Sequence, residues 1–319
     1  MGTILEMKNV RVGRKSRDGF SAILENVNFA IDEGEFVAVV GESGCGKSMT
    51  ALSIMGLLPK EMEVGSGSIA YCGKDLTKMT AKELNKIRGK EISMIFQEPM
   101  TSLNPSFTIG NQLAEVFQYH TNLSAKEIKQ QSIEVLNQVK IPDAEEKLKA
   151  YPHELSGGMR QRVMIAMALA CKPKILIADE PTTALDVTIQ AQILELLYEL
   201  QQKLNMTVIM ITHDLGVVAE TCHKAIVMYA GQVIEEAQVE ELFEKPKHPY
   251  TKALMLSVPK LGDPKKELYA IEGSVPDFDH MPKGCRFHPR CPAATIECIE
   301  KEPQLEVIGQ TRRVRCWHM

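Results

Sequence analysis

The chain has 319 residues, of which 44% are hydrophobic and 24% are charged, so its composition is that of an ordinary soluble globular protein. The longest apolar run, 163–171, is far shorter than the roughly 18 to 20 residues of a membrane helix, which argues against a bilayer span. The formal net charge of −4 argues against bulk electrostatic binding of nucleic acid, and we expect no nucleic-acid partner.

The first segments of the chain predict a β flank followed by an α/β core. Residues 4–12 and 23–31 alternate in the two-residue period of a half-exposed sheet, which favours antiparallel strands. The continuous apolar runs 36–40, 174–179 and 207–212 are typical of strands that are covered on both faces, as in a parallel sheet. The N-terminus carries no secretory signal, so we expect a cytosolic protein.

A glycine-rich segment, GESGCGKS at 41–48, follows the first of these buried runs and precedes a helical stretch. Glycines let the backbone curl so that N–H groups and a helix N-terminus face one polyphosphate. In this pattern Lys47 reaches the β and γ phosphates of a nucleotide, and the Ser48 hydroxyl completes the Mg²⁺ shell. The predicted nucleotide-binding residues of this segment are Gly41, Ser43, Gly44, Cys45, Gly46, Lys47, Ser48 and Met49.

Helical periodicity dominates from about 105 to 150, where apolar residues recur three and four apart. Ser124 and Glu127 have the spacing of a capping box at the start of a helix. Beyond about 240 the proline content rises, strand signals fade, and a C-terminal extension begins. We therefore expect a domain at 1–240, with a helical insert at about 98–160, and an extension at 241–319.

The run ILIADE at 175–180 ends an apolar strand in two carboxylates, as would a strand that simply emerges into solvent. In a phosphoryl-transfer site the first carboxylate, here Asp179, holds Mg²⁺ through its water shell. The second, Glu180, can polarise the attacking water.

A third motif, LSGGMRQR at 155–162, could by itself be a helix N-terminus with Ser156 as its cap. Beside a phosphate loop and a strand that ends in Asp-Glu, it resembles the signature motif of ATP-binding cassette (ABC) ATPases. Gln97 resembles the Q-loop glutamine of that family, Asp186 its D-loop aspartate, and His213 its switch histidine. The resemblance covers about residues 4–240. It implies an α/β P-loop core with an antiparallel β subdomain and a helical signature subdomain, to which a small Cys-containing C-terminal extension is added.

The resemblance also implies roles for these residues. Ser156 and Gly158 would face the γ-phosphate of ATP bound to a second ATPase subunit, so that two subunits close head-to-tail over two nucleotides. His213 would contact the γ-phosphate, and Gln97 would join the ATP site to the helical insert. Glu180, His213 and Gln97 are the implied catalytic residues, and the implied Mg²⁺ ligands are Ser48, Gln97 and Asp179.

Two positions depart from the family pattern. Met159 replaces the glutamine that is common at the fifth signature position, where the side chain is not expected to take part in the chemistry. The aromatic residue that usually stacks on adenine is expected near Arg14, which is not aromatic. Either the Arg14 guanidinium stacks on the base or Phe20 does, and the sequence leaves both possibilities open.

Three classes of protein remain possible: the ATPase of a membrane transporter, a soluble cassette protein acting on DNA or ribosomes, and a redox- or metal-responsive regulator. The interval between phosphate loop and signature is about a hundred residues and the chain has one cassette, which favours the transporter. Residues 96–105, 247–251 and 284–292 resemble the ATPase subunits of peptide and nickel importers. This resemblance implies a prokaryotic protein at the cytoplasmic face of the membrane, with a related second ATPase, two permeases and an extracellular peptide-binding protein. Dipeptides, oligopeptides and chelated nickel all remain open as substrates.

Eight cysteines in a cytosolic chain are not expected to form disulfides. Four are scattered singly and are typical of small buried hydrophobes, namely Cys45, Cys72, Cys171 and Cys222. The other four crowd the last 35 residues and favour a metal site, namely Cys285, Cys291, Cys298 and Cys316. Their intervals of five, six and seventeen residues are wider than those of the usual zinc knuckle, whereas an iron–sulfur cluster tolerates wide spacing. Members of the family resembled hold a [4Fe–4S] cluster on four such cysteines, so we expect a structural or redox-sensing cluster, with Zn²⁺ as the alternative.

Overall fold

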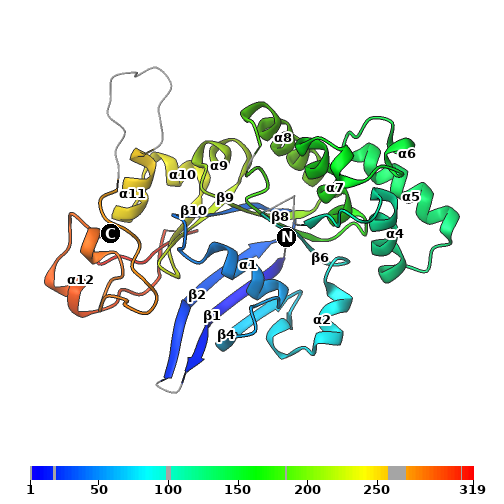
Figure 1. Cartoon of the computed structure of the whole chain (residues 1–319). Coiled ribbons are helices and arrows are strands. Elements are labelled where there is room, and N and C mark those ends of the chain that lie inside the picture. The colour runs from blue at the N-terminus through cyan, green and yellow to red at the C-terminus, as the bar shows by residue number, and fades with distance from the viewer. Residues whose placement is uncertain (1, 17–18, 98–101, 184, 258–270, 310) are drawn as a thin grey trace. The chain divides into compact units, whose positions relative to one another are not determined.

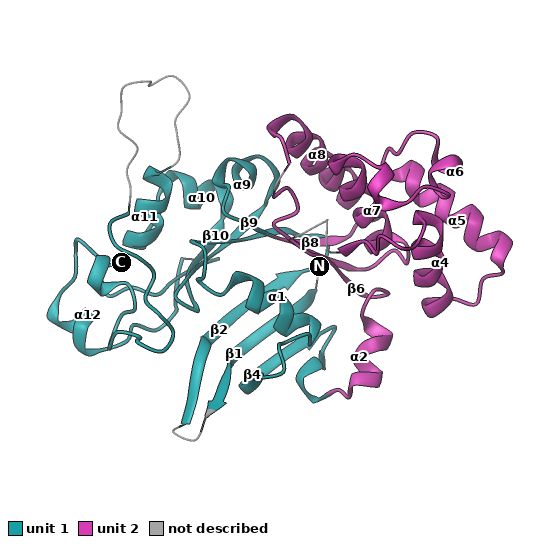
Figure 2. Ribbon diagram, in the orientation of Figure 1, with its two compact units in different colours: residues 1–78, 211–319 teal, residues 79–210 magenta. Residues whose placement is uncertain are grey.

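The computed structural model of the chain describes residues 2–16, 19–97, 102–183, 185–257, 271–309 and 311–319. Figure 1 shows the chain with its helices and strands labelled. Its contacts divide it into two compact units, one formed by residues 1–78 and 211–319 and the other by residues 79–210 (Figure 2). Each unit is described by itself.

The first unit contains a four-stranded antiparallel sheet in the order β2-β1-β4-β5. Its strands are β1 (Thr3–Ser16), β2 (Gly19–Asp32), β4 (Met62–Tyr71) and β5 (Lys74–Asp75). Along β2 the buried residues Leu24, Val27, Phe29 and Ile31 face the core, while most of their neighbours are half-exposed. The antiparallel strands predicted from the alternation at 4–12 and 23–31 are therefore confirmed as β1 and β2.

The first unit also holds the strand succession β11-β12-β10-β9-β3. These strands are β3 (Phe36–Val40), β9 (Lys224–Tyr229), β10 (Gln232–Gln238), β11 (Glu306–Ile308) and β12 (Arg312–Val314). Its helices of six or more residues are α1 (Lys47–Met55), α9 (Leu215–Thr221), α10 (Val239–Glu244) and α11 (Pro249–Leu256). The expected parallel pairing is confirmed, because β3 runs parallel to β9 and is buried along its whole length. The chain continues through α12 (Ile296–Glu300) before β11.

Two strands in the C-terminal extension correct the expectation that strand signals end near 240. Both are three residues long, which is too short for a hydrophobic period to show in the sequence. β12 instead pairs with β10, where Arg312 and Arg313 meet the carboxylates of Glu235 and Glu236. The extension thus adds strands to the edge of the sheet.

The second unit contains the parallel pair β6 (Ile92–Ile95) and β7 (Ile175–Asp179), and the part of β8 (Thr207–Thr212) up to Met210 lies beside β7. Its helices are α2 (Ala81–Ile87), α4 (Ile109–His120), α5 (Ala125–Gln138), α6 (Ala144–Lys147), α7 (Gly157–Leu169) and α8 (Val187–Leu204). The helical stretch at 105–150 and the Ser124–Glu127 capping box are confirmed, because Ser124 and Glu127 bond each other's backbone N–H groups.

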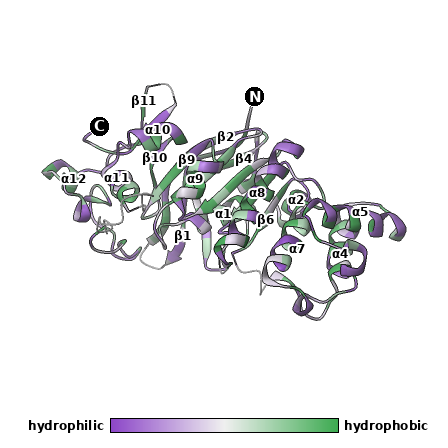
Figure 3. Cartoon of the chain, turned by 90° about the horizontal axis from the view of Figure 1, so that it is seen from above, coloured by the Kyte–Doolittle hydropathy of each residue, from purple (hydrophilic) through white to green (hydrophobic). Residues whose placement is uncertain are grey.

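In Figure 3, helices such as α4, α5 and α7 carry both hydrophilic and hydrophobic residues. None of the helices within the described ranges combines the length and apolar character that crossing a bilayer requires.

The singly placed cysteines differ in burial. Cys45 and Cys222 are buried, as predicted, and Cys171 is half-buried. The expectation is wrong for Cys72, which is exposed. Cys72 lies in the turn between β4 and β5 with a positive φ of 47°, so its backbone serves the turn and its side chain faces solvent.

Candidate functional site

The phosphate-loop segment connects β3 to α1 in the first unit. Gly41, Gly44 and Gly46 have φ angles of 151°, 78° and 104°, a region that side chains disfavour. A Cβ at Gly41 would lie 2.3 Å from the carbonyl oxygen of Met228, so this position also needs the absence of a side chain. Gly46 precedes α1 and supplies no side-chain cap, and a helix N-terminus of this kind favours anions.

Lys47 is folded over this loop. Its ammonium donates to the carbonyl oxygens of Gly41, at 2.7 Å, and Glu42, at 3.0 Å. Lys47 is only 6% exposed, which places the positive charge inside the curl of the loop. Cys45 lies beside it, and burial raises the pKa of the thiol, so Cys45 is a neutral packing residue at physiological pH.

The first unit also carries both adenine candidates and the predicted switch histidine. Arg14 is exposed on β1, whereas Phe20 is half-buried with the Arg11 guanidinium 4.9 Å from its ring centroid. A Cβ at Gly65 would lie 2.7 Å from the Phe20 ring, so Phe20 packs closely on β4. His213 is exposed and directly follows β8.

The second unit brings together two of the predicted catalytic residues. β7 ends at Asp179, which is 5% exposed, and Glu180 follows with a positive φ of 46°. The Gln97 amide donates to Glu180 Oε2 at 2.8 Å, and the Thr183 hydroxyl donates to the same oxygen at 3.0 Å. A left-handed backbone at a non-glycine residue costs energy, and here it coincides with a carboxylate held by two donors. Residues 98–101, which belong to the predicted Q-loop motif, lie outside the described residues.

The signature segment begins α7. Ser156 is its N-cap and accepts the N–H of Met159 at 3.4 Å, as the capping interpretation predicts. A Cβ at Gly158 would lie 2.8 Å from Ile189, so this glycine allows α7 to approach α8. Asp186 caps α8 by accepting the N–H of Ile189 at 2.9 Å. The predicted residues Ser156, Gly158 and Asp186 thus belong to the ends of two adjacent helices.

Sequence reasoning missed three contacts made next to predicted site residues. Gln161, which is buried, donates to the carbonyl oxygen of Pro181 at 2.6 Å and joins α7 to the segment that follows Glu180. Tyr250 and Arg290 contact Glu42 of the phosphate loop. Both lie in motifs that were recognised as family marks, but nothing in their spacing predicts contact with a residue more than 200 positions earlier.

The four C-terminal cysteines gather in the first unit. The Cys285 N–H donates to the Cys298 carbonyl at 2.8 Å. Burial raises the pKa of Cys285 to about 11, and Cys298, Cys316 and Cys291 add to this rise. His318, which the sequence did not indicate, places Nε2 3.6 Å from Cys298 Sγ and its N–H 3.4 Å from Cys316 Sγ. Within the described part of the chain, no group of three or more His, Cys, Asp or Glu side chains is arranged to hold a metal ion, so the structure does not support the expected metal site.

Two family models match the chain. Residues 24–183 match the ABC transporter model, and residues 234–298 match the C-terminal region of oligopeptide/dipeptide transporters. The chain is 53% identical to the oligopeptide transport ATP-binding protein AppD of Bacillus subtilis, over 99% of this chain and 97% of the relative. It is 50% identical to the dipeptide transport ATP-binding protein DppD of Escherichia coli, over 92% of this chain and 90% of the relative. Among solved structures, the dimeric ATP-binding cassette MJ0796 bound to ADP and Pi is similar with a TM-score of 0.66 and 31% identity, covering 74% of this chain and 98% of that one.

Proposed function

Since this chain belongs to the ABC transporter family of ATPases, we propose that it is the ATP-hydrolysing subunit that powers an importer of dipeptides or oligopeptides. One observation carries the proposal: the similarity to ATP-binding proteins of peptide transport extends through the C-terminal region as well as the cassette. The division into a nucleotide-binding domain at 1–240 and an extension at 241–319 is part of the same proposal.

In the ATP site that we propose, the glycine-rich loop and Lys47 bind the phosphates, and Ser48, Asp179 and Gln97 hold Mg²⁺. Glu180 polarises the attacking water, and the hydrogen bond from Gln97 supports this role because it orients the carboxylate. His213 contacts the γ-phosphate. Arg14 is the better candidate to stack on adenine, because the Phe20 ring is already engaged by Arg11 and Gly65.

The proposed partners are a second, related ATPase and two permeases, with an extracellular peptide-binding protein acting through the permeases. Ser156, Gly158 and Asp186 would face the nucleotide of the second ATPase. The segment 101–107 is the proposed permease contact, and its residues 102–107 lie within the described part of the chain. Gln112 fixes this segment by accepting the Asn104 N–H and donating to the Phe107 carbonyl, and the Phe107 side chain is 50% exposed. The subunit would then work at the cytoplasmic face of a prokaryotic membrane.

For the four C-terminal thiols we propose a [4Fe–4S] cluster, with Zn²⁺ as the alternative. Four thiols within the C-terminal extension are soft ligands that suit either metal. When bound, the cluster would fold the segment 285–298 and could respond to oxidation. Anaerobic purification should yield a brown protein with about four irons per chain. A colourless protein with one zinc would refute the cluster, and a protein with neither metal would refute the site.

Transport distinguishes the candidate substrates. The permeases that co-purify with the chain should be reconstituted with it in vesicles that contain ATP. The binding protein and either a peptide or a nickel chelate are then added to the outer medium. ATP-dependent uptake of di- or oligopeptides is the expected result. Uptake of the nickel chelate alone would support the second candidate function, an importer of metal chelates, and ATP hydrolysis without any associated permease would refute transport.

A further inference from the structure

The C-terminal extension contacts the phosphate-binding loop at Glu42. The Tyr250 hydroxyl oxygen accepts the Glu42 backbone N–H at 2.9 Å. The Arg290 guanidinium binds the Glu42 carboxylate with two donors, Nη1 to Oε2 at 2.7 Å and Nη2 to Oε1 at 3.0 Å. Glu42 is therefore held through both its backbone and its side chain by residues of the extension.

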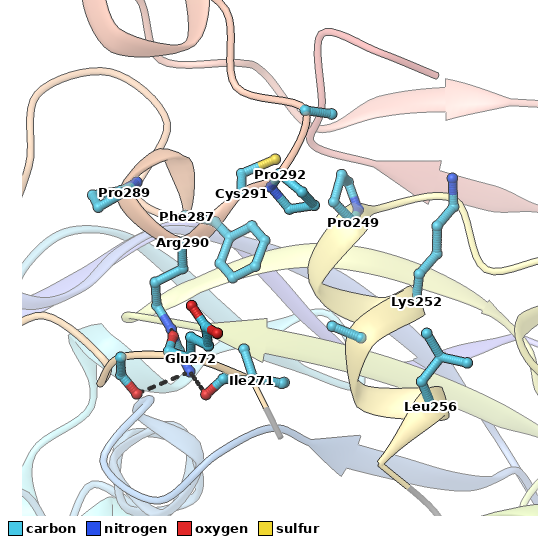
Figure 4. A pocket seen from close by; sticks show the side chains of 13 residues that line it. Pro249, Lys252, Leu256, Ile271, Glu272, Phe287, Pro289, Arg290, Cys291 and Pro292 are labelled. Carbon is cyan, nitrogen blue, oxygen red and sulfur yellow. Dashed lines mark hydrogen bonds between the residues drawn. The ribbon is translucent and has the colours of Figure 1, made fainter. Parts of the chain in front are cut away.

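Arg290 is itself held in one orientation. Its side chain is 5% exposed, and Nε donates to the carbonyl oxygen of Glu272 at 2.8 Å while Nη2 donates to that of Ile271 at 3.2 Å. Figure 4 shows Arg290 at one side of a cavity of about 750 Å³, with Cys291 and Phe287 on the same stretch of chain. A bidentate pair with a fixed guanidinium sets position as well as charge.

Tyr250 is held by an aromatic cluster. The ring centroids of Tyr229 and Tyr250 are 4.7 Å apart, and Phe287 lies 5.1 Å from Tyr229 and 5.4 Å from Tyr250. All three side chains are at most 2% exposed. Phe287 and Arg290 both belong to the segment between Cys285 and Cys291. This segment therefore contacts Glu42 directly through Arg290 and packs on Tyr250 through Phe287.

The charge of Glu42 gives this contact a consequence for binding. A carboxylate next to a loop that receives a polyphosphate would repel it, and the repulsion is strong where the side chains are shielded from water. The Arg290 guanidinium cancels this charge. Both carboxylate oxygens of Glu42 accept hydrogen bonds from Arg290, so the orientation of the Glu42 side chain is fixed.

We infer that the C-terminal extension supports the phosphate-binding loop, with Arg290 and Tyr250 as positioning residues that fix Glu42 and, through it, set the affinity for nucleotide phosphates. This inference rests on the proposed ATP site. According to this inference, the extension contributes to nucleotide binding by the ATPase. Tight nucleotide binding then requires that the cysteine-rich segment is folded.

The test measures the dissociation constant of MgATP for the purified full-length chain. Arg290→Gln should weaken binding about tenfold, which corresponds to about 1.4 kcal/mol. Glu42→Gln in the same chain should restore the affinity to within about twofold, because the repelling charge is gone while Tyr250 still holds the backbone. A purely structural role for Arg290 would not give this rescue.

The matched control is Arg313→Gln, which removes an ion pair between Arg313 of the extension and Glu236 of β10. Glu236 keeps Lys224 as a partner at 2.8 Å, so this variant should lose some thermal stability and keep its ATP affinity. Equal loss of affinity in Arg313→Gln, wild-type affinity in Arg290→Gln, or a loss that Glu42→Gln does not repair would each overturn the inference.

Should Arg290→Gln fail to fold, Tyr250→Phe decides the question, because it removes a single hydroxyl. It should weaken MgATP binding about threefold, and unchanged affinity would overturn the inference. The proposed function fails separately: a wild-type chain that binds no MgATP would refute the ATP site, whereas a wild-type chain that binds MgATP leaves the test of Arg290 valid.

Discussion

Replacement of Glu180 by glutamine tests the proposed water-polarising role with little disturbance of the structure. Gln97 and Thr183 both donate to the same oxygen, Oε2, at 2.8 and 3.0 Å. A glutamine carbonyl oxygen at that position can accept both donors. The change then removes the negative charge and leaves the hydrogen bonds, so we expect it to alter the free energy of unfolding by about 1 kcal/mol or less.

The expected effect on hydrolysis is much larger. Loss of a positioned general base lowers a rate by roughly 10² to 10⁴, which corresponds to about 2.7 to 5.4 kcal/mol in the activation free energy. Binding of MgATP should persist, because the phosphate loop is unchanged. Glu180→Gln should therefore separate binding from turnover.

Phosphate release should be measured in the assembled transporter with the ATP site of the partner subunit blocked, and MgATP binding in the purified chain. Glu199→Gln provides the control, because it makes the same chemical change in the same unit at an exposed pair with Lys140. Hydrolysis by Glu180→Gln within a fewfold of the control would refute the reasoning, as would a loss of MgATP binding equal to the loss of turnover.

Three further predictions follow from other parts of the molecule. Ser156→Arg should abolish hydrolysis at the site that contains the phosphate loop of the partner ATPase and spare the site that contains Lys47; a cross-link between Ser156 and Lys47 of one chain would contradict this. Residues 102–107 should gain protection from hydrogen exchange on assembly with the permeases, and unchanged exchange would refute the proposed contact. Burial, with Lys252 and Arg315 nearby, lowers the pKa of His248 to about 3 from an unfolded value near 6.5. The unfolded chain therefore binds more protons between these values, and stability falls as the pH drops below about 6.5, by at most about 1.4 kcal/mol per pH unit for this group. His248→Asn, which can still accept the N–H at the start of α11, should lose that part of the slope in denaturant titrations across this range, and an unchanged slope would contradict the assignment.

Local patterns predicted the elements that carry most of the candidate site. The runs 36–40 and 175–179 form buried strands because every residue in them is apolar except Asp179, which ends its strand, and such runs have few alternatives in an α/β core. The glycines of 41–48 predicted a curled loop because their φ angles are open to no other residue type at comparable cost. The predicted catalytic pair Gln97 and Glu180 meets in one unit, although their roles remain predictions.

Contacts between distant segments could not be predicted from the sequence. Arg290 and Glu42 are 248 residues apart, and neither lies in a periodic pattern that indicates a partner. The strand Arg312–Val314 has no apolar alternation and forms because its arginines match glutamates on β10. The contact between His318 and Cys298, which are 20 residues apart, likewise has no local sequence pattern that predicts it. Each of these contacts depends on tertiary packing, which overrides local preference.

The contacts between the extension and the start of the chain also set an order of events during protein synthesis. Arg290 is added 248 residues after Glu42, and Arg315 is added 289 residues after Asn26, whose carbonyl it contacts. At about 5 to 20 residues per second, the ribosome needs roughly 12 to 50 s to supply the 248 residues that complete the phosphate-loop support. During that interval the phosphate loop lacks the contact between Arg290 and Glu42. We therefore expect the first unit to finish folding late. Chains truncated before Arg290 should be degraded by cellular proteases, and should not persist as weak ATPases that compete for the permeases.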